Sequence, residues 1–221
     1  MNENWRMKNK TLVCFALKEE ASPFRRMAVA ASADVLIVGI GRENAVKSVR
    51  KFLVTHSPEL VLTCGFAGGL NPNLKVGDVL FEPIGLTGTN PRLKEIFIKA
   101  GAKPASFYCA DRIATTVAEK RELRTQTGAD VVEMESAAIQ AVCAEHGLPC
   151  ATVRVISDTA DEDLPLDFNA LSKADKSLDF RKLFLTIAKS PGKIGALLAL
   201  QKKTSFAAKQ LATVLGKIIS P

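Results

Sequence analysis

The sequence has few of the residues that mark a metal centre, a disulfide framework or a membrane span. It contains two histidines, and its five cysteines include no C-x-x-C pair. Because no cluster has metal-ligand spacing, we expect no metal or other cofactor, and we expect free thiols in a reducing cytoplasm. No apolar run approaches the roughly 18 residues that a spanning helix needs, and the polar segment 1–10 lacks the apolar core of a signal peptide.

Several common catalytic motifs are missing as well. There is no G-x-S-x-G of a nucleophile elbow and no G-K-S/T of a P-loop. Gly39-Ile40-Gly41 lacks the third glycine of a dinucleotide-binding fingerprint. The sequence therefore gives no support to a serine hydrolase triad, a P-loop nucleotidase or a Rossmann dehydrogenase.

The net charge of +7 is concentrated near the end of the chain. Residues 171–221 hold nine Lys and one Arg against two Asp, a surplus of eight. The rest of the chain is close to neutral and has no basic stripe interleaved with aromatic side chains. We therefore expect no nucleic-acid partner.

Apolar runs alternate with helical patterns through the 221 residues, of which 47% are hydrophobic. The predicted strands are 11–16, 34–39, 61–64, 76–81, 105–109, 129–133 and 151–156. The predicted helices are 17–28, 42–55, 91–100, 136–146, 178–189 and 193–219. This alternation predicts an α/β fold with a parallel or mixed sheet covered on both faces. We expect residues 1–10 to be disordered and residues 11–221 to form one domain that ends in a basic helix.

Four short segments each follow a predicted buried strand. They are Ala16–Glu20, Gly65–Gly69, Val132–Glu135 and Ser157–Asp158. In an open α/β sheet, ligands bind in the crevice outside the carboxyl ends of the strands. The segments would therefore bring carboxylates and a glycine turn to one small-molecule site.

The carboxylates have different chemical uses. Glu135, with Glu133 two residues before it, suits the paired hydroxyls of a sugar. Asp158, next to Ser157 at the end of a buried strand, suits proton donation, and Glu20 suits a base toward water. Each also has an ordinary structural alternative as a helix-start carboxylate or N-cap.

In order and spacing, these segments resemble the purine nucleoside phosphorylase and methylthioadenosine/S-adenosylhomocysteine nucleosidase superfamily. The resemblance runs from about residue 11 to 161, and Val-Glu-Met-Glu followed by Arg-Val-Ile-Ser-Asp is its most specific part. It implies a three-layer α/β/α sandwich with a mixed central sheet. It also implies cleavage of an N-glycosidic bond, with Asp158 protonating purine N7, Glu135 and Met134 holding the ribose, and Glu20 activating water.

Two departures bear on the substrate. Phe66 stands where methylthioadenosine nucleosidases have a serine near the sugar, and because a phenyl ring cannot donate to phosphate, hydrolysis is favoured over phosphorolysis. The resemblance further places Ile113 and Ala114 at the base, where relatives often carry an aromatic ring.

The end of the chain resembles the branch associated with hopanoid biosynthesis, which is thought to remove adenine from an adenosyl-hopane lipid. The resemblance rests on Asp163–Phe168, on Ser190-Pro191-Gly192 and on the basic, apolar helix 193–219. That helix has the pattern of one that lies on an anionic membrane surface. It has equally the pattern of a helix packed on the sheet with its lysines in water.

We therefore predict a purine nucleosidase that releases adenine from a 5′-substituted adenosine, either an adenosyl-hopanoid or a methylthioadenosine-like nucleoside. The alternatives are a phosphate-dependent phosphorylase, a non-catalytic nucleoside-binding relative and a peripheral membrane adaptor. The resemblance also implies a homo-oligomer.

Overall fold

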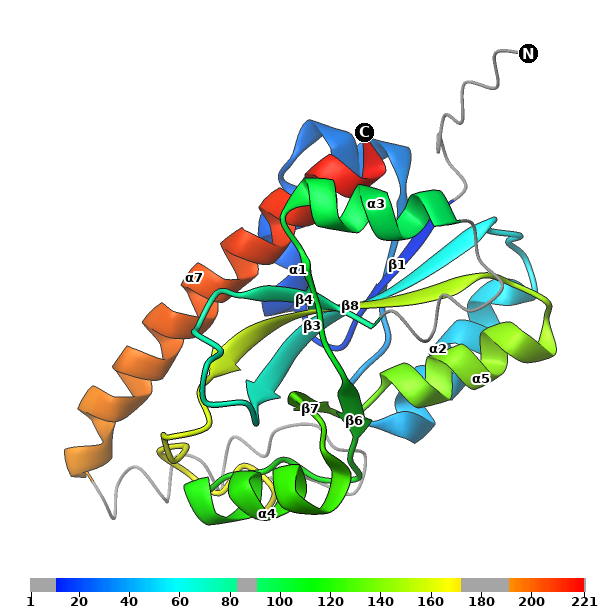
Figure 1. Cartoon of the computed structure of the whole chain (residues 1–221). Coiled ribbons are helices and arrows are strands. Elements are labelled where there is room, and N and C mark those ends of the chain that lie inside the picture. Colours follow the sequence, from blue (N-terminus) through cyan, green and yellow to red (C-terminus); the bar gives the residue numbers. More distant parts are fainter. Residues whose placement is uncertain (1–10, 83–90, 172–190, 221) are drawn as a thin grey trace.

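Strands and helices alternate along the chain, as the sequence pattern predicts (Figure 1). The computed structural model describes residues 11–82, 91–171 and 191–220. The predicted disorder of residues 1–10 and the predicted helix 178–189 lie outside these residues.

The strands are β1 (Thr11–Phe15), β2 (Asp34–Ile37), β3 (Leu60–Gly69), β4 (Val79–Phe81), β5 (Lys103–Pro104), β6 (Phe107–Cys109), β7 (Val131–Glu133) and β8 (Cys150–Asp158). The helices are α1 (Lys18–Arg25), α2 (Arg42–Leu53), α3 (Pro91–Ala100), α4 (Val117–Thr127), α5 (Ser136–Glu145) and α7 (Ile194–Ile219), with short 3₁₀ turns η1 (Ala28–Ser32) and η3 (Pro191–Lys193).

The sheet is mixed. Its main order is β2-β1-β3-β8-β4-β5, in which β1, β2, β3 and β8 run parallel and β4 runs antiparallel to β8. β7 pairs antiparallel with the last residues of β3, and β6 pairs parallel with β7. The predicted mixed sheet is therefore confirmed.

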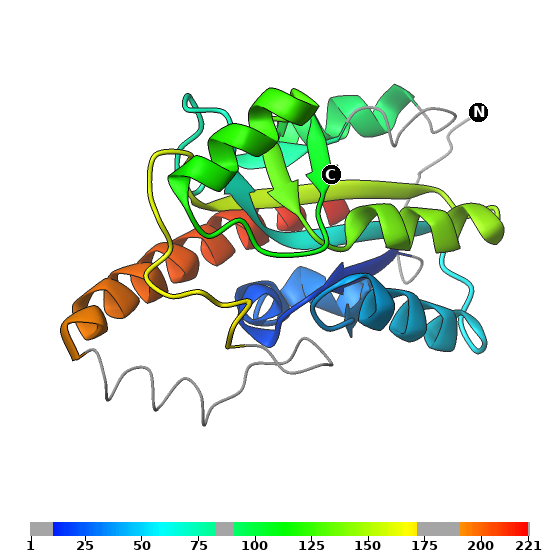
Figure 2. The same cartoon turned by 90° about the horizontal axis from the view of Figure 1, so that it is seen from below.

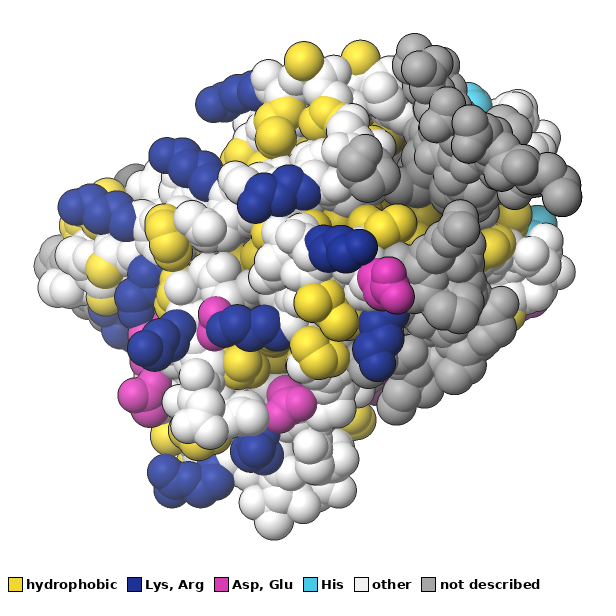
Figure 3. All heavy atoms as spheres, turned by 45° about the horizontal axis from the view of Figure 1, so that its top comes forward, with side chains coloured by type: hydrophobic (Ala, Val, Ile, Leu, Met, Phe, Trp, Pro, Cys, Tyr) yellow, Lys and Arg dark blue, Asp and Glu magenta, His cyan; other side chains and the backbone are white. Residues whose placement is uncertain are grey.

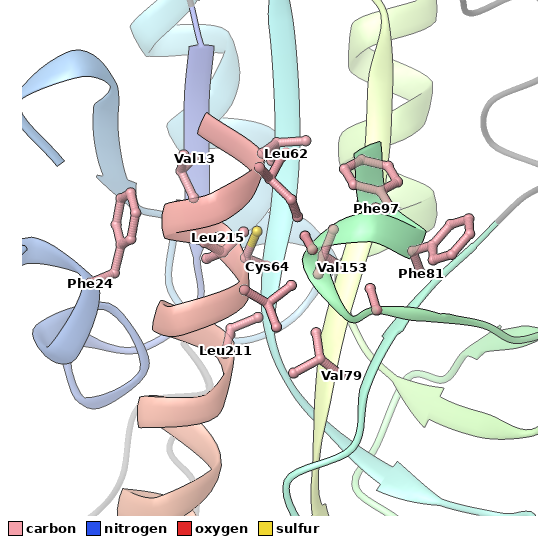
Figure 4. Packing of buried hydrophobic residues seen from close by; sticks show 14 of the residues in the cluster. Val13, Phe24, Leu62, Cys64, Val79, Phe81, Phe97, Val153, Leu211 and Leu215 are labelled. Carbon is pink, nitrogen blue, oxygen red and sulfur yellow. The ribbon is translucent and has the colours of Figure 1, made fainter. Parts of the chain in front are cut away.

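Helices cover both faces of the sheet and make three layers. Apolar side chains of α1, α3 and α7 form one core with β1, β3, β4 and β8, and Figure 4 shows Leu211 and Leu215 of α7 beside Cys64 of β3, with Phe24 of α1 on the other side of the helix. Apolar side chains of α2 and α5 form a second core on the opposite face. The three-layer α/β/α arrangement agrees with the predicted fold class.

Side chains along β3 and β8 alternate between these two cores, as a strand requires. On β8, Val153 and Val155 face the α7 layer, whereas Arg154 and Asp158 have the opposite parity. The register pairs Gly65 with Arg154 and Gly68 with Asp158. Arg154 and Asp158 therefore each lie beside a glycine of β3, the neighbouring central strand.

The structure differs from the predicted elements mainly in one helix. Residues 117–127 form α4, which the sequence reasoning did not predict, because this segment is strongly charged and has no clear apolar stripe. Thr116 caps it, its hydroxyl accepting a hydrogen bond from the Glu119 amide while Glu119 reaches back to the start of the helix. A left-handed Gly128 ends it.

The last helix, α7, has two unlike halves. From Ala207 onward its apolar side chains are buried against the sheet, whereas Ile194, Leu198 and Phe206 are 45 to 53% exposed. In Figures 1 and 2 the first turns of α7 extend beyond the sheet at the end where the segment 159–171 lies. None of the helices that the structure describes is long and apolar enough to cross a membrane.

Candidate active site

The structure gathers the predicted carboxylates around the carboxyl ends of β3 and β8. Glu20, Glu133, Glu135 and Asp158 are all buried there, although each carries an ionisable group. Buried charges need partners, so the contacts of each carboxylate indicate what it is held for.

Glu20 comes from the first turn of α1 and reaches across to β3. Its Oε1 accepts a hydrogen bond from the Phe66 amide (2.8 Å), and its Oε2 accepts one from the Leu17 amide (2.9 Å). Burial raises the pKa of this carboxyl to about 7, against the opposing pull of the Phe66 amide and the Arg154 guanidinium. A carboxylate with that pKa is a competent general base at neutral pH.

Gly65 leaves the space in which Glu20 and Arg154 approach each other. A Cβ added to this residue would lie 2.6 Å from Nη1 of Arg154 and 2.7 Å from Oε1 of Glu20. Its φ of +150° is also one that residues with side chains rarely adopt. Residues 65–69, which the sequence predicted as a turn after the strand, instead continue β3, and Gly65 makes room in that strand for charged side chains of the protein itself.

Arg154 is the hub of the cluster, and the sequence reasoning did not assign it a role. Its Nη2 lies 2.5 Å from Oε2 of Glu133 and 3.3 Å from Oε2 of Glu135. Although burial disfavours its charge, Glu133 and Glu135 raise the pKa of Arg154 above its ordinary value. Among the described residues, no acceptor contacts its buried Nε. An arginine inside the apolar run 151–156 was the sequence feature that could have revealed it.

Glu133 and Glu135 flank Met134 where β7 gives way to α5, and the two carboxylates differ in character. Glu133 accepts from the Ser136 amide (2.8 Å), the Ser136 hydroxyl (2.6 Å) and Arg154. Burial opposes its ionisation, but Arg154 and the Ser136 donors hold the pKa of Glu133 below its ordinary value. Both oxygens of the Glu133 carboxylate are therefore occupied by hydrogen bonds from Arg154 and from the start of α5.

Glu135 has a looser set of partners. Its Oε1 accepts a hydrogen bond from the Gly41 amide (2.8 Å) at the start of α2, its Oε2 lies 3.3 Å from Nη2 of Arg154, and the Met134 amide also donates to this carboxylate. Burial raises its pKa, as does the nearby Glu133 carboxylate, while Arg154 lowers it. Of the two, Glu135 has more capacity left to accept hydrogen bonds from a sugar.

Asp158 ends β8 beside Gly68 of β3. Its Oδ1 accepts a hydrogen bond from the Ser157 hydroxyl (2.6 Å), and its Oδ2 lies 2.6 Å from Nζ of Lys120. The Lys120 side chain is fully buried and comes from α4. The sequence reasoning missed Lys120 because it did not predict that helix.

The structure places the other predicted residues around this pair of strands. Ala114 is buried with Val132 in a small cluster, and the Ile113 backbone exchanges two hydrogen bonds of 2.9 Å with the Asn169 side chain. The Phe66 side chain packs against the core on the α7 face, while its amide serves Glu20. In the part of the chain that the structure describes, no hydrogen bond joins Ile113 to Asp158, and a common role for them at the base stays a prediction.

Among the residues that the structure describes, no group of three His, Cys, Asp or Glu side chains is arranged to hold a metal. The five cysteines are free, and four of them are buried. The charged groups that the structure brings together at the site are carboxylates, Arg154 and Lys120.

Comparisons with known proteins point to one family. Residues 92–189 match the model of the phosphorylase superfamily. The chain is 31% identical over 176 residues to a 5′-methylthioadenosine/S-adenosylhomocysteine nucleosidase of Marinomonas, covering 63% of this chain and 74% of the relative. It is 27% identical over 162 residues to an aminodeoxyfutalosine nucleosidase of Campylobacter jejuni, covering 59% of this chain and 69% of the relative.

Solved structures share the fold over nearly the whole length. The structure of a Neisseria meningitidis 5′-methylthioadenosine/S-adenosylhomocysteine nucleosidase in complex with methylthio-immucillin-A has a TM-score of 0.70 at 21% identity, covering 96% of this chain and all of that one. A futalosine hydrolase of Helicobacter pylori has a TM-score of 0.69 at 18% identity, covering 97% and 98%. The chain belongs to the phosphorylase superfamily, and it is an enzyme of the nucleosidase and nucleoside phosphorylase class.

Proposed function

We propose that this protein hydrolyses the N-glycosidic bond of a 5′-substituted adenosine and releases adenine. The observation that carries the proposal is the placement of Glu20 and Asp158 at two points along the last residues of β3. Glu20 contacts the strand at Gly65 and Phe66, and Asp158 lies beside Gly68. Three residues of strand span roughly 10 Å, so a base and an acid can act on different parts of one ligand.

The chemistry of the bond matches these groups. Cleavage builds positive charge on the sugar and negative charge on the leaving purine, so an acid at the base and carboxylates near the sugar lower the barrier. In this proposal Asp158 delivers a proton to N7, Glu135 with Met134 holds the ribose hydroxyls, and ionised Glu20 takes a proton from the attacking water. The pKa of Glu20, about 7, then predicts activity that rises as the pH increases through neutrality.

Hydrolysis is favoured over phosphorolysis by Phe66. Its amide is already bonded to Glu20, and its side chain packs into the core, so neither offers a donor to phosphate. We therefore expect adenine release that does not depend on phosphate. A strong phosphate requirement would contradict this and favour the phosphorylase alternative.

The 5′ group is proposed to be apolar. The relatives suggest a methylthioadenosine-like nucleoside, whereas the exposed apolar side chains of α7 favour an adenosyl lipid such as an adenosyl-hopanoid. Lys193, Lys202 and Lys203 lie on or next to the same half of α7, and Figure 3 shows hydrophobic side chains between Lys and Arg on one face of the molecule. Such a surface suits peripheral contact with an anionic membrane.

The decisive assay measures adenine release by chromatography, with and without phosphate. Methylthioadenosine, S-adenosylhomocysteine, inosine and an adenosyl lipid in vesicles are compared at equal concentration. Release from none of them would contradict the proposal and leave a nucleoside-binding protein, which calorimetry with adenine would then test. The predicted homo-oligomer is checked on the same sample by light scattering.

Asp158→Asn tests the acid directly. The amide cannot supply the proton, so we expect turnover to fall by about 10²- to 10⁴-fold, with the melting temperature recorded to verify folding. A variant that folds and keeps its rate would remove Asp158 from this role.

A further inference from the structure

Lys120 is a fully buried lysine whose partners join the site to a neighbouring segment. Its Nζ lies 2.6 Å from Oδ2 of Asp158 and donates hydrogen bonds to the backbone carbonyls of Thr159 (2.7 Å) and Glu162 (2.9 Å). Lysines are almost never fully buried unless they are paired. Three acceptors match the three donors of an ammonium group, so this site is built for the charged form.

The two carbonyls belong to a segment, residues 159–171, that we call the strap. The strap lies against residues 111–116, the base loop, which contains Ile113 and Ala114. The Leu164 amide donates to the Thr115 carbonyl (2.8 Å), and the Asn169 side chain bonds both backbone groups of Ile113. Lys120 follows the base loop on α4, so one side chain touches the acid and anchors the strap that supports the loop.

We propose that Lys120 is a positioning residue for cleavage, which fixes Asp158 and the strap in one arrangement. The inference rests on the proposed function, because it assigns Lys120 to the acid of that reaction. An acid that is already held at the right place and angle can transfer its proton without first being ordered. Three contacts of one buried ammonium group supply that order here.

Other groups near Asp158 do not duplicate this role. Ser157 contributes a neutral hydroxyl from β8, and Gly68 of β3 contributes no side chain. Asp161 is exposed in the strap and accepts a hydrogen bond from the Thr159 hydroxyl. Lys203 of α7 pairs with Glu162 at the half-exposed edge of the strap. Lys120 is the cation that contacts Asp158 among the described residues.

The test compares kcat and KM for adenine release by wild type, Lys120→Met and Lys203→Met, with folding verified by the melting temperature. Lys203→Met is the matched control, because it removes a lysine that holds the same strap without touching Asp158. For Lys120→Met we expect kcat to fall about tenfold or more while KM stays within about threefold of wild type, because the acid is misplaced and substrate binding is kept. For Lys203→Met we expect both kcat and KM to stay within about threefold of wild type.

The outcomes separate this inference from the function on which it rests. If wild type releases no adenine, the proposed function fails and the inference fails with it. If wild type is active and folded Lys120→Met keeps the wild-type kcat, or if Lys203→Met loses as much kcat as Lys120→Met, the inference is wrong, since a lysine that only holds the strap would act alike in both variants.

A measurement on wild type covers the case in which Lys120→Met does not fold. In protein labelled with ¹⁵N-lysine, we expect one ammonium resonance protected from solvent exchange, and we expect it to shift when adenine binds. A spectrum without a protected resonance, or with one that adenine does not move, would overturn the proposal.

Discussion

Two buried ionic clusters meet at the end of the sheet, and they differ in charge balance. In the arginine cluster, Arg154 faces three carboxyl groups, those of Glu20, Glu133 and Glu135. In the lysine cluster, Lys120 faces Asp158 and backbone carbonyls. The arginine cluster has more acidic side chains than basic ones, whereas the lysine cluster has one acidic and one basic side chain.

The surplus explains why one carboxyl in the arginine cluster titrates near neutrality. Glu133 has Arg154 closest and keeps a lowered pKa, whereas burial raises the pKa of Glu20 to about 7 and also raises that of Glu135. A buried site with more acids than bases must hold a proton somewhere at neutral pH. The lysine cluster instead fixes geometry, since both its charges and all three ammonium donors are matched.

We expect the largest loss of stability from replacing Arg154, the cation of the arginine cluster. Arg154→Met leaves Glu133 and Glu135 buried without their cation, so we expect the free energy of unfolding to fall by about 3 to 5 kcal/mol in urea titrations at pH 7. Arg50→Met is the control, because Arg50 pairs with Glu145 at 2.8 Å on the surface. It should cost less than about 1 kcal/mol. Equal losses of unfolding free energy in the two variants would mean that the arginine cluster does not depend on Arg154.

A methyl group at Gly65 should disturb the same cluster without changing a charge. The added Cβ would overlap Arg154 and Glu20, so we expect Gly65→Ala to lose about 3 kcal/mol of stability and most activity. Gly101→Ala provides the comparison, because Gly101 has a φ of +103° but no described atom lies within 4 Å of an added Cβ. It should cost about 1 to 2 kcal/mol of backbone strain and leave the rate unchanged. Similar activity in both variants would contradict the role of Gly65.

Because Glu20 belongs to the cluster with more acids than bases, we expect the stability of the protein to depend on pH through this residue. Its pKa is about 7 in the folded protein and 4.5 ordinarily, so the folded state keeps a proton that the unfolded chain releases. The stability that this proton contributes is complete below about pH 4.5 and is lost as the pH rises through 7.

Glu20→Gln removes this titration. Relative to wild type, we expect the variant to gain roughly 2 to 3 kcal/mol in unfolding free energy between pH 5 and 8, whatever its absolute stability. Parallel stability curves for the two proteins would show that Glu20 has an ordinary pKa. The variant should also be inactive at every pH if Glu20 is the base.

The sequence predicted the arginine cluster better than the lysine cluster, for a physical reason. Apolar strand runs and the acids that follow them are local patterns, so the strands and the positions of Glu20, Glu135 and Asp158 could be predicted. Arg154 lies in such a run, but its role was not predicted. The periodicity of a sequence indicates where a strand lies, and it does not show which charged side chains the neighbouring strands bring to that strand. Pairing across β3, β7 and β8 is a property of the tertiary fold.

Lys120 was beyond this reasoning because its burial depends on distant segments. Nothing local distinguishes it from the other lysines of a charged, weakly amphipathic helix. It is buried only because the strap, about 40 residues further along, wraps over it with two carbonyls. The pattern of helix 193–219 left membrane contact and packing on the sheet open, and it did not predict that the first half of α7 is exposed while the second half packs on the sheet.

The smallest effect is expected in the lysine cluster, from the loss of a neutral partner. Ser157→Ala removes the hydroxyl that donates to Oδ1 of Asp158 at 2.6 Å but leaves Lys120 in place. One hydrogen bond contributes about 1 kcal/mol, so we expect kcat to fall by no more than about tenfold. Ser48→Ala, which removes a hydroxyl bonded to the Val38 carbonyl away from the site, should leave kcat unchanged. A loss of 100-fold or more in Ser157→Ala would mean that the hydroxyl, and not the ammonium group, fixes the acid.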